Sequence, residues 1–123
     1  MIIGICGKSG SGKSTLAKEI TNIYGDKAIH CDIDKIIQNN KNKIIILDWL
    51  LLPKSKYFNN CCIKILLDIP YEIRKQRAIA RDNITEEAFD LREKASYKYN
   101  NDLFDIIISN NSKEEYERIV KLI

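Results

Sequence analysis

Gly7-Lys8-Ser9-Gly10-Ser11-Gly12-Lys13-Ser14 is the stretch that decides the fold of this chain. It fills every fixed position of the pattern G-x-x-x-x-G-K-[ST], which is typical of a phosphate-binding loop. Its glycines let successive backbone N–H groups converge on phosphate oxygens, and a helix beginning near Lys13 adds its positive end. The stretch therefore predicts a binding site for a nucleoside triphosphate.

Side chains at the end of this loop supply the polar groups that a bound triphosphate needs. Lys13 places a mobile positive charge beside the transferred phosphate, and Ser14 offers a hydroxyl oxygen to Mg²⁺. Thr15 is expected to bond the α-phosphate at the next turn of the helix. The predicted ATP-binding residues of the loop are Gly7, Gly10, Ser11, Gly12, Lys13, Ser14 and Thr15.

Short apolar runs alternate with amphipathic segments along the rest of the chain. The run before the loop, Ile2 to Cys6, is rich in isoleucine, as in a strand buried on both faces. After the loop, apolar residues at helical spacing predict a helix that ends at Gly25. Further strands are predicted at Lys27–Cys31, Lys43–Asp48, Ile63–Asp68 and Phe104–Ser109, and further helices from Pro70 to about Ala80, from Thr85 onward, and over Lys113–Leu122. This alternation predicts an α/β fold, a P-loop NTPase-like, doubly wound parallel sheet of about five strands with flanking helices.

Length and composition narrow the class of protein. The 123 residues suit a single domain over 1–123, with 45% hydrophobic and 30% charged residues. The net charge of +3 comes from basic residues that are spread out, which argues against a nucleic-acid partner. The longest apolar stretch, Ile44 to Leu52, is far shorter than the ~20 residues of a membrane span. We expect a cytoplasmic protein with reduced cysteines, no membrane association and no obligate protein partner.

Three aspartates follow predicted strands, at the sheet edge where ligands bind in open α/β folds. Asp32 and Asp34 end the second strand, where one carboxylate would take the proton of an acceptor hydroxyl and the other would hold Mg²⁺ through water. A helix N-cap with an extra solvated acid is the alternative for this pair. Asp48 ends the third strand in the place of a Walker B acid that coordinates Mg²⁺, and the alternative there is a polar strand end that caps a loop.

Basic side chains gather in the segment 74–98. Arg77 and Arg81 are four residues apart and share a helix face, so both can reach one ligand. In small kinases such a hinged basic segment closes over ATP as a lid and excludes water from the transferred group. A solvated basic face is the alternative for each arginine taken singly. The group consists of Arg74, Lys75, Arg77, Arg81, Arg92 and Lys94.

Taken in order, these segments resemble the dephospho-coenzyme A (dephospho-CoA) kinase family of P-loop kinases. Asp32-Ile33-Asp34 stands where the family has Asp-Ala-Asp, and Asp48-Trp49-Leu50-Leu51-Leu52 is similar to its Asp-x-Pro-Leu-Leu. The family's order of strand, lid and asparagine turn is followed by Asp68-Ile69-Pro70, Arg77, Arg81-Asp82, Arg92 and Asp105-Ile106-Ile107-Ile108-Ser109-Asn110-Asn111. The resemblance covers nearly the whole chain. It implies transfer of a phosphate from Mg-ATP to the ribose 3′-hydroxyl of dephospho-CoA.

The resemblance also implies roles for single residues. Asp34 is similar to the family's base for the acceptor hydroxyl, Arg81 to a lid arginine that contacts ATP, and Asn110 to a residue of the loop near adenine. Combined with the loop chemistry, the catalytic candidates are Lys13, Asp32, Asp34 and Arg81. Arg77, Arg81 and Asn110 join the ATP-binding residues, and the candidate ligands of the Mg²⁺ cofactor are Ser14, Asp32 and Asp48.

Two departures from the family concern the acceptor side. Family members carry His or Arg a few residues after the acidic pair, where this chain has Gln38, and then insert several helices that hold the coenzyme A end of the acceptor. Only twelve residues, Asp32 to Lys43, join the second and third strands here, so most of that insertion is absent. Two alternatives therefore stay open, another small-molecule P-loop kinase and a non-catalytic ATP-binding remnant of a dephospho-CoA kinase.

Overall fold

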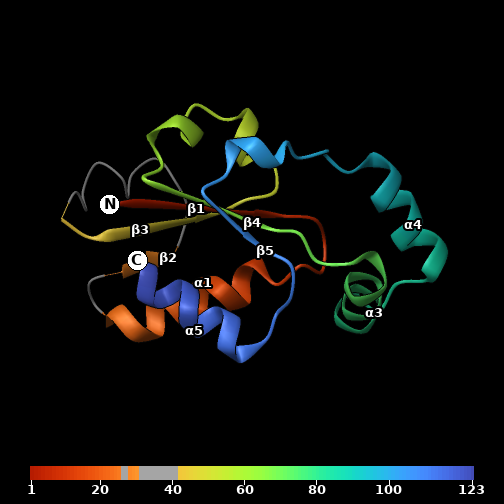
Figure 1. Cartoon of the computed structure of the whole chain (residues 1–123). Coiled ribbons are helices and arrows are strands. Elements are labelled where there is room, and N and C mark those ends of the chain that lie inside the picture. The colour runs from red at the N-terminus through yellow and green to blue at the C-terminus, as the bar shows by residue number, and fades with distance from the viewer. Residues whose placement is uncertain (26–27, 31–41) are drawn as a thin grey trace.

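The computed structural model describes residues 1–25, 28–30 and 42–123, which form a five-stranded parallel sheet with flanking helices. The strands are β1 (Ile2–Gly7), β2 (Ala28–His30), β3 (Ile44–Asp48), β4 (Ile63–Leu67) and β5 (Ile106–Ile108). Their order across the sheet is β2-β3-β1-β4-β5, so β1 lies in the centre and carries the phosphate loop at its carboxyl end (Figure 1). The predicted α/β fold with a parallel sheet is confirmed.

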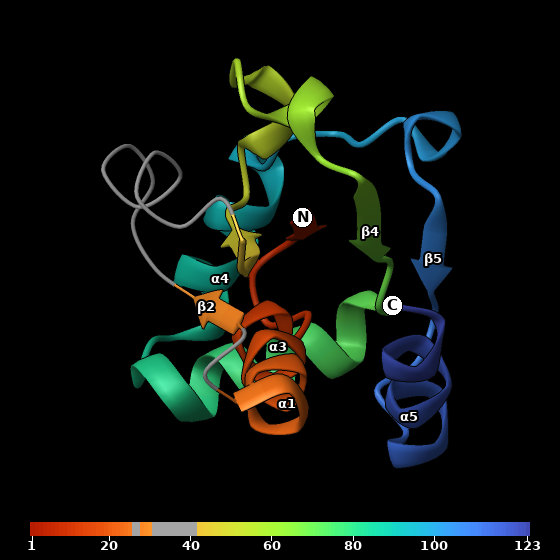
Figure 2. The same ribbon diagram turned by 90° about the vertical axis from the view of Figure 1, so that its left-hand side faces the viewer.

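Different elements cover the two faces of the sheet in the described part of the chain. On one face lie α1 (Lys13–Tyr24) and α5 (Lys113–Leu122), as Figures 1 and 2 show. Over the other face lie short 3₁₀ turns, namely η2 (Leu52–Lys54), η3 (Phe58–Asn60) and η4 (Asn101–Leu103). A hairpin of α3 (Tyr71–Asp82) and α4 (Glu86–Ala95) projects beyond the carboxyl end of the sheet (Figure 1).

Two apolar clusters explain why the strands are isoleucine-rich on both sides. Toward α1 and α5, the side chains of Ile3, Ile5 and Ile65 pack against helix residues such as Leu16 and Ile119. Toward the 3₁₀ turns, the cluster consists of Cys6, Ile45, Leu47, Leu52, Phe58, Cys61 and Leu66. Full burial of each large aliphatic side chain contributes about 1.5–3 kcal/mol. The sheet edge that carries the loop is therefore a firmly packed support.

The structure shifts several of the predicted boundaries by one or two residues, and the shifts at α3 and β5 have a local cause. α3 continues past Ala80 to Asp82 and stops at Asn83, whose φ of 51° is left-handed and ends a helix. β5 is shorter than predicted because one of the two hydrogen bonds between Asp105 and Lys64 uses the Asp105 carboxylate in place of a backbone carbonyl. The Lys64 N–H donates to the Asp105 carboxylate at 2.8 Å, and the Asp105 N–H donates to the Lys64 carbonyl at 2.9 Å.

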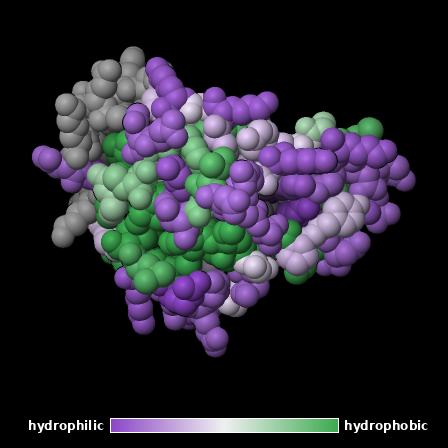
Figure 3. Space-filling view, turned by 45° about the horizontal axis from the view of Figure 1, so that its top comes forward, coloured by the Kyte–Doolittle hydropathy of each residue, from purple (hydrophilic) through white to green (hydrophobic). Residues whose placement is uncertain are grey.

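The surface of the α3–α4 hairpin differs in polarity from the surface of the rest of the molecule. In Figure 3 the projection formed by α3 and α4 is mainly hydrophilic, whereas apolar side chains show over the body of the sheet. Among the described residues, no helix combines the length and the apolar character needed to cross a bilayer. The hairpin thus adds little to the core and presents charged side chains near the carboxyl edge of the sheet.

Candidate functional site

The phosphate loop joins β1 to α1 in a tight turn that depends on glycine. Gly10 and Gly12 have φ values of 80° and 92°, which side chains other than glycine rarely adopt. The Ser11 N–H donates to the Lys8 carbonyl at 3.1 Å and closes the turn. A Cβ atom on Gly10 would lie 2.3 Å from the carbonyl oxygen of Arg74, so the loop is in direct contact with the backbone of α3.

The side chain of Lys13 lies against the phosphate loop. Its ammonium donates to the carbonyl of Gly7 at 2.9 Å and to that of Lys8 at 3.4 Å. Burial lowers the pKa of Lys13, while the nearby Asp48 carboxylate acts in the opposite direction. A negatively charged phosphate in the loop would restore the preference for the ammonium form, as expected for a phosphate-binding lysine.

Ser14 and Asp48 meet at the start of α1. The Ser14 hydroxyl donates to Asp48 Oδ2 at 2.9 Å, because the parallel pairing of β1 with β3 sets Ile5 beside Asp48. A hydroxyl and a carboxylate side by side next to a phosphate loop are the hard oxygen ligands that Mg²⁺ prefers, so this pair fits the predicted metal site. Asp32 and Asp34, the other acidic candidates, lie outside the described residues.

A pocket of about 320 Å³ opens beside the loop and is the candidate nucleotide pocket. Its lining brings together five residues predicted from the sequence, Gly10, Gly12, Thr15, Arg77 and Arg81, with Asn111 and Tyr116. Of the remaining loop residues, Gly7 accepts a hydrogen bond from Lys13, and Ser11 has a fully buried side chain. The loop, the first turn of α1 and the hairpin therefore converge on one cavity.

Asn111, which the sequence reasoning did not select, joins three parts of this pocket. Its amide Nδ2 donates to the Ser11 carbonyl at 3.0 Å and to the Tyr116 hydroxyl at 2.6 Å, and its Oδ1 accepts from Arg77. The predicted residue, Asn110, instead accepts from the Ser112 N–H at 3.1 Å within its own turn. Because the two asparagines are adjacent, the sequence does not show which of them contacts the loop and which bonds within its own turn. The one available signal is Ser112, which precedes a helix and marks the capping turn.

Arg81 and Arg92 share one carboxylate on the hairpin. Arg81 Nε and Nη2 donate to Asp82 at 2.8 and 3.0 Å, and Arg92 Nη1 donates to the same group at 2.8 Å. These contacts hold the pKa of Asp82 far below its ordinary value, with Arg81 as the larger cause. Asp82 thereby fixes the orientation of Arg81 at the mouth of the nucleotide pocket.

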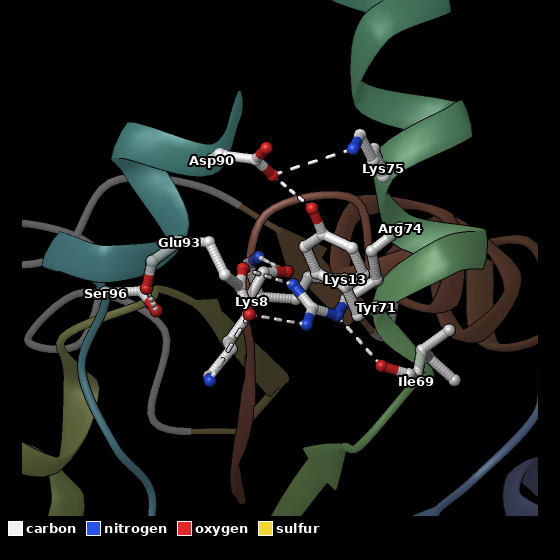
Figure 4. Close-up of polar contacts among 9 residues, drawn as sticks. All are labelled: Lys8, Lys13, Ile69, Tyr71, Arg74, Lys75, Asp90, Glu93 and Ser96. Atoms are coloured by element: carbon white, nitrogen blue, oxygen red, sulfur yellow. Dashed lines mark hydrogen bonds and ion pairs between the residues drawn. The ribbon is translucent and has the colours of Figure 1, made fainter. Parts of the chain in front are cut away.

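Arg74 has a structural position at the base of the hairpin (Figure 4). Its guanidinium donates to both oxygens of Glu93 at 2.8 and 2.7 Å and to the Ile69 carbonyl at 2.8 Å. Only 5% of Arg74 is exposed, and its guanidinium joins α3 to α4. Lys8 of the loop lies 3.5 Å from the same carboxylate and brings the loop into this cluster.

Comparison of the sequence with known proteins relates this chain to kinases. Residues 2–50, which include the loop and β3, match the phosphoribulokinase / uridine kinase family. Over 84 residues the chain is 32% identical to the dephospho-CoA kinase of Prochlorococcus marinus (strain MIT 9312). That match covers 67% of this chain and 41% of the length of the relative.

Solved structures share the fold over nearly the whole chain. TT1252 from Thermus thermophilus aligns with a TM-score of 0.72 at 18% identity, covering 99% of this chain and 95% of that one. The deoxyadenosine kinase of M. mycoides aligns with a TM-score of 0.66 at 19% identity, covering 99% and 98%. Shikimate kinase from Acinetobacter baumannii aligns with a TM-score of 0.61 at 14% identity, covering 98% and 91%.

The fold and the loop define the class of this protein. It is a P-loop kinase-like protein, with a parallel sheet whose central strand leads into a phosphate loop. Within that class it is similar to dephospho-CoA kinase, and the resemblance predicted from the sequence is confirmed.

Proposed function

We propose that this chain transfers the γ-phosphate of ATP to the ribose 3′-hydroxyl of dephospho-CoA, a step of coenzyme A biosynthesis. The observation that carries the donor side of the proposal is the 2.9 Å contact of Ser14 with Asp48 at the end of an intact phosphate loop. The identity of 32% to a curated dephospho-CoA kinase supports the acceptor.

The donor half of the reaction would rest on positive charge placed around the phosphates. The backbone amides of the loop and the start of α1 face the β- and γ-phosphates, and Lys13 turns from the Gly7 carbonyl toward them. Arg77 and Arg81 line the same pocket, where their guanidinium groups neutralise charge that develops on the transferred group. Asn111 keeps Arg77 beside the loop.

Mg²⁺ is the cofactor that this donor set suits. We assign Ser14 and Asp48 as its protein ligands, together with Asp32 from outside the described residues. When bound, the ion would neutralise negative charge on the β- and γ-phosphates. Ser14 and Asp48 would then exchange their mutual hydrogen bond for contacts to the ion and its waters.

Acid–base work on the acceptor is assigned to Asp34 through the family resemblance. The Asp34 carboxylate would orient the acceptor hydroxyl and take its proton as the phosphate is transferred. Segment 74–98, which contains most of α3 and α4, would close over ATP as the lid of a single domain spanning 1–123. The free thiols Cys6, Cys61 and Cys62 support a reducing compartment, and we place the protein in the cytoplasm.

A turnover assay tests this proposal. The chain is incubated with Mg-ATP and dephospho-CoA, ADP is followed, and the reaction is repeated with nucleosides and without an acceptor. ADP that forms only with dephospho-CoA supports the proposal, and ADP that forms only with another acceptor indicates a different small-molecule kinase. Measurable ATP affinity with no turnover on any acceptor would leave a nucleotide-binding remnant.

Lys13→Ala serves as the internal control of that assay. Because Lys13 is the cation closest to the loop carbonyls, its removal should lower turnover by on the order of 10²-fold or more. Full activity and full ATP affinity in this variant would contradict the assignment of the loop itself.

A further inference from the structure

A second cavity lies beside the phosphate loop, on the side away from the nucleotide pocket. Its volume is about 190 Å³, which is room for about six water molecules at roughly 30 Å³ each. Leu66 and Leu67 at the end of β4 belong to its apolar lining. The polar part of the lining consists of Lys8, Asp68, Arg74, Lys98, Tyr99 and Asn101.

The two cavities lie near the carboxyl edge of the sheet and take residues from different covering elements. The nucleotide pocket uses Thr15 of α1 and Tyr116 of α5, the helices that cover one face. The second cavity uses Tyr99 and Asn101, which adjoin or belong to η4 over the other face (Figure 1). Lys8 of the phosphate loop lines the second cavity, and Gly10 and Gly12 line the nucleotide pocket, so both cavities border the loop.

Basic side chains outnumber carboxylates in the lining of the second cavity, and two of the basic side chains, Arg74 and Lys8, contact Glu93. Lys8, Arg74 and Lys98 line it against the single carboxylate of Asp68 among the described lining residues. Arg74 is engaged by two hydrogen bonds to Glu93, whereas the Lys8 ammonium lies 3.5 Å from Glu93 and its side chain is 31% exposed (Figure 4). Lys8 and Lys98 are therefore the flexible cations that can turn toward an anion.

The wall of the cavity is fixed by Tyr99. Its hydroxyl lies 3.3 Å from the Gly7 carbonyl and 2.5 Å from the Leu50 carbonyl, and its ring packs edge-on against Phe104. Burial raises the pKa of Tyr99, so the hydroxyl keeps its proton and its role as a donor. Lys98 and Asn101 are thereby held at a fixed distance from the loop, which is what a preformed anion site needs.

We propose that this cavity binds the anionic part of the phosphate acceptor, a diphosphate ester, through Lys8 and Lys98. The inference rests on the proposed function, because dephospho-CoA carries a diphosphate next to the ribose that is phosphorylated. It extends that function by assigning an acceptor contact to residues outside the acidic pair. Asn101 adds an amide that can donate to a phosphate oxygen.

Binding of inorganic pyrophosphate is the first test, made with the phosphate loop already filled. The chain is saturated with the Mg complex of a non-hydrolysable ATP analogue, and pyrophosphate is titrated in the presence of excess Mg²⁺. Amide shifts in the NMR spectrum should move at 98–101 and much less at 10–14. Lys98→Ala should weaken pyrophosphate binding on the order of tenfold, and Asp68→Asn should tighten it about threefold. Lys121→Ala on the exposed side of α5 is the matched control for loss of a lysine.

The second test uses the acceptor itself, dephospho-CoA. It distinguishes a diphosphate that is part of the acceptor from a free anion. Lys98→Ala should weaken dephospho-CoA by the same factor as pyrophosphate, and should leave the affinity for adenosine, which has no phosphate, unchanged. Inorganic phosphate and acetate serve as monoanion probes, and tighter binding of either than of pyrophosphate would overturn the diphosphate assignment. Equal pyrophosphate affinity in Lys98→Ala and Lys121→Ala would overturn the site. The pyrophosphate titration does not depend on turnover. An inactive chain that still binds pyrophosphate at this site would therefore contradict the proposed function and leave the proposed anion site standing.

Discussion

Replacement of Gly10 by alanine tests whether the phosphate loop and α3 pack as closely as the structure shows. Gly10 has φ of +80°, and a Cβ atom there would lie 2.3 Å from the carbonyl oxygen of Arg74 and 3.0 Å from its carbonyl carbon. An ordinary contact begins at 3.4 Å. The loop and the first turns of α3 must therefore separate by about 1 Å, because the opposing atoms belong to the backbone and cannot rotate away.

The expected loss of stability has two parts. A left-handed backbone costs an alanine about 1–2 kcal/mol, and forcing a methyl group into a packed contact costs about 1–3 kcal/mol. Together they lower the free energy of unfolding by about 2–5 kcal/mol, a large part of the about 5–15 kcal/mol of a typical domain. Because the phosphate-binding amides move with Gly10, Mg-ATP affinity should also fall on the order of 100-fold.

Gly25→Ala is the matched control for this variant. Gly25 also has positive φ, +56°, but a Cβ atom there meets nothing within 4 Å among the described residues, so only the backbone cost remains. Urea denaturation followed by circular dichroism gives the free energy of unfolding, and calorimetry gives the Kd for Mg-ATP. Equal destabilisation of the two variants, with unchanged ATP affinity in Gly10→Ala, would refute the close packing of loop and helix.

Further predictions concern the surroundings of the loop. Asn111→Leu should weaken Mg-ATP about tenfold in calorimetry, because it frees both the loop and Arg77. Hydrogen bonds from Arg74 hold the pKa of Glu93 in the folded protein below its ordinary value. These bonds therefore stabilise the fold fully at a pH above the ordinary pKa of a glutamate, and the stabilisation is lost as the pH falls through the lowered pKa of the folded protein. In Glu93→Gln, urea unfolding should therefore depend less on pH between about 5 and 3. Burial raises the pKa of Cys6 to about 12, so peptide mapping after iodoacetamide treatment at pH 8 should find Cys6 protected and the exposed Cys62 alkylated.

Each of these predictions has a result that contradicts it. Asn110→Leu is the control for Asn111, since the Asn110 side chain bonds to Ser112 within its own turn, and equal losses of ATP affinity would remove the special role of Asn111. An unchanged pH dependence in Glu93→Gln would show that the ion pair with Arg74 does not contribute. Alkylation of Cys6 as fast as that of Cys62 would contradict the burial of the former.

The fold could be predicted because its signals are local. An isoleucine-rich strand before a glycine loop, a helix that ends at Gly25, and a helix capped by Thr85 all appear where expected, and the Thr85 hydroxyl accepts from the Ala88 N–H at 3.1 Å. Ser14 and Asp48 are each predicted from the sequence as Mg²⁺ ligands, and the structure brings them together because adjacent parallel strands end at one edge of the sheet.

The protein partners of Arg74 and Arg77 could not be predicted, because charge alone does not identify a partner. Arg74 and Arg77 are one turn apart in the sequence, yet Arg74 is buried against Glu93, 19 residues away, and Arg77 reaches Asn111, 34 residues away. Which arginine faces the ligand depends on how α3 and α4 cross. The angle at which the two helices cross is set by tertiary packing, and the spacing of the arginines in the sequence does not predict it.

The contacts of the hairpin decide which part of it can move when a triphosphate binds. Arg74 near the start of α3 and Glu93 near the end of α4 are joined by two hydrogen bonds, and Lys8 attaches the phosphate loop to the same carboxylate. Both helices are thus fixed at the end nearest the sheet. The turn between them lies at the far end, with Arg81 beside it, and so closure is expected to bend the distal part while the base stays in place. A change at Glu93 should therefore loosen the base of the hairpin, whereas a change at Arg81 should alter its bonds to Asp82 near the turn and the proposed contact with ATP.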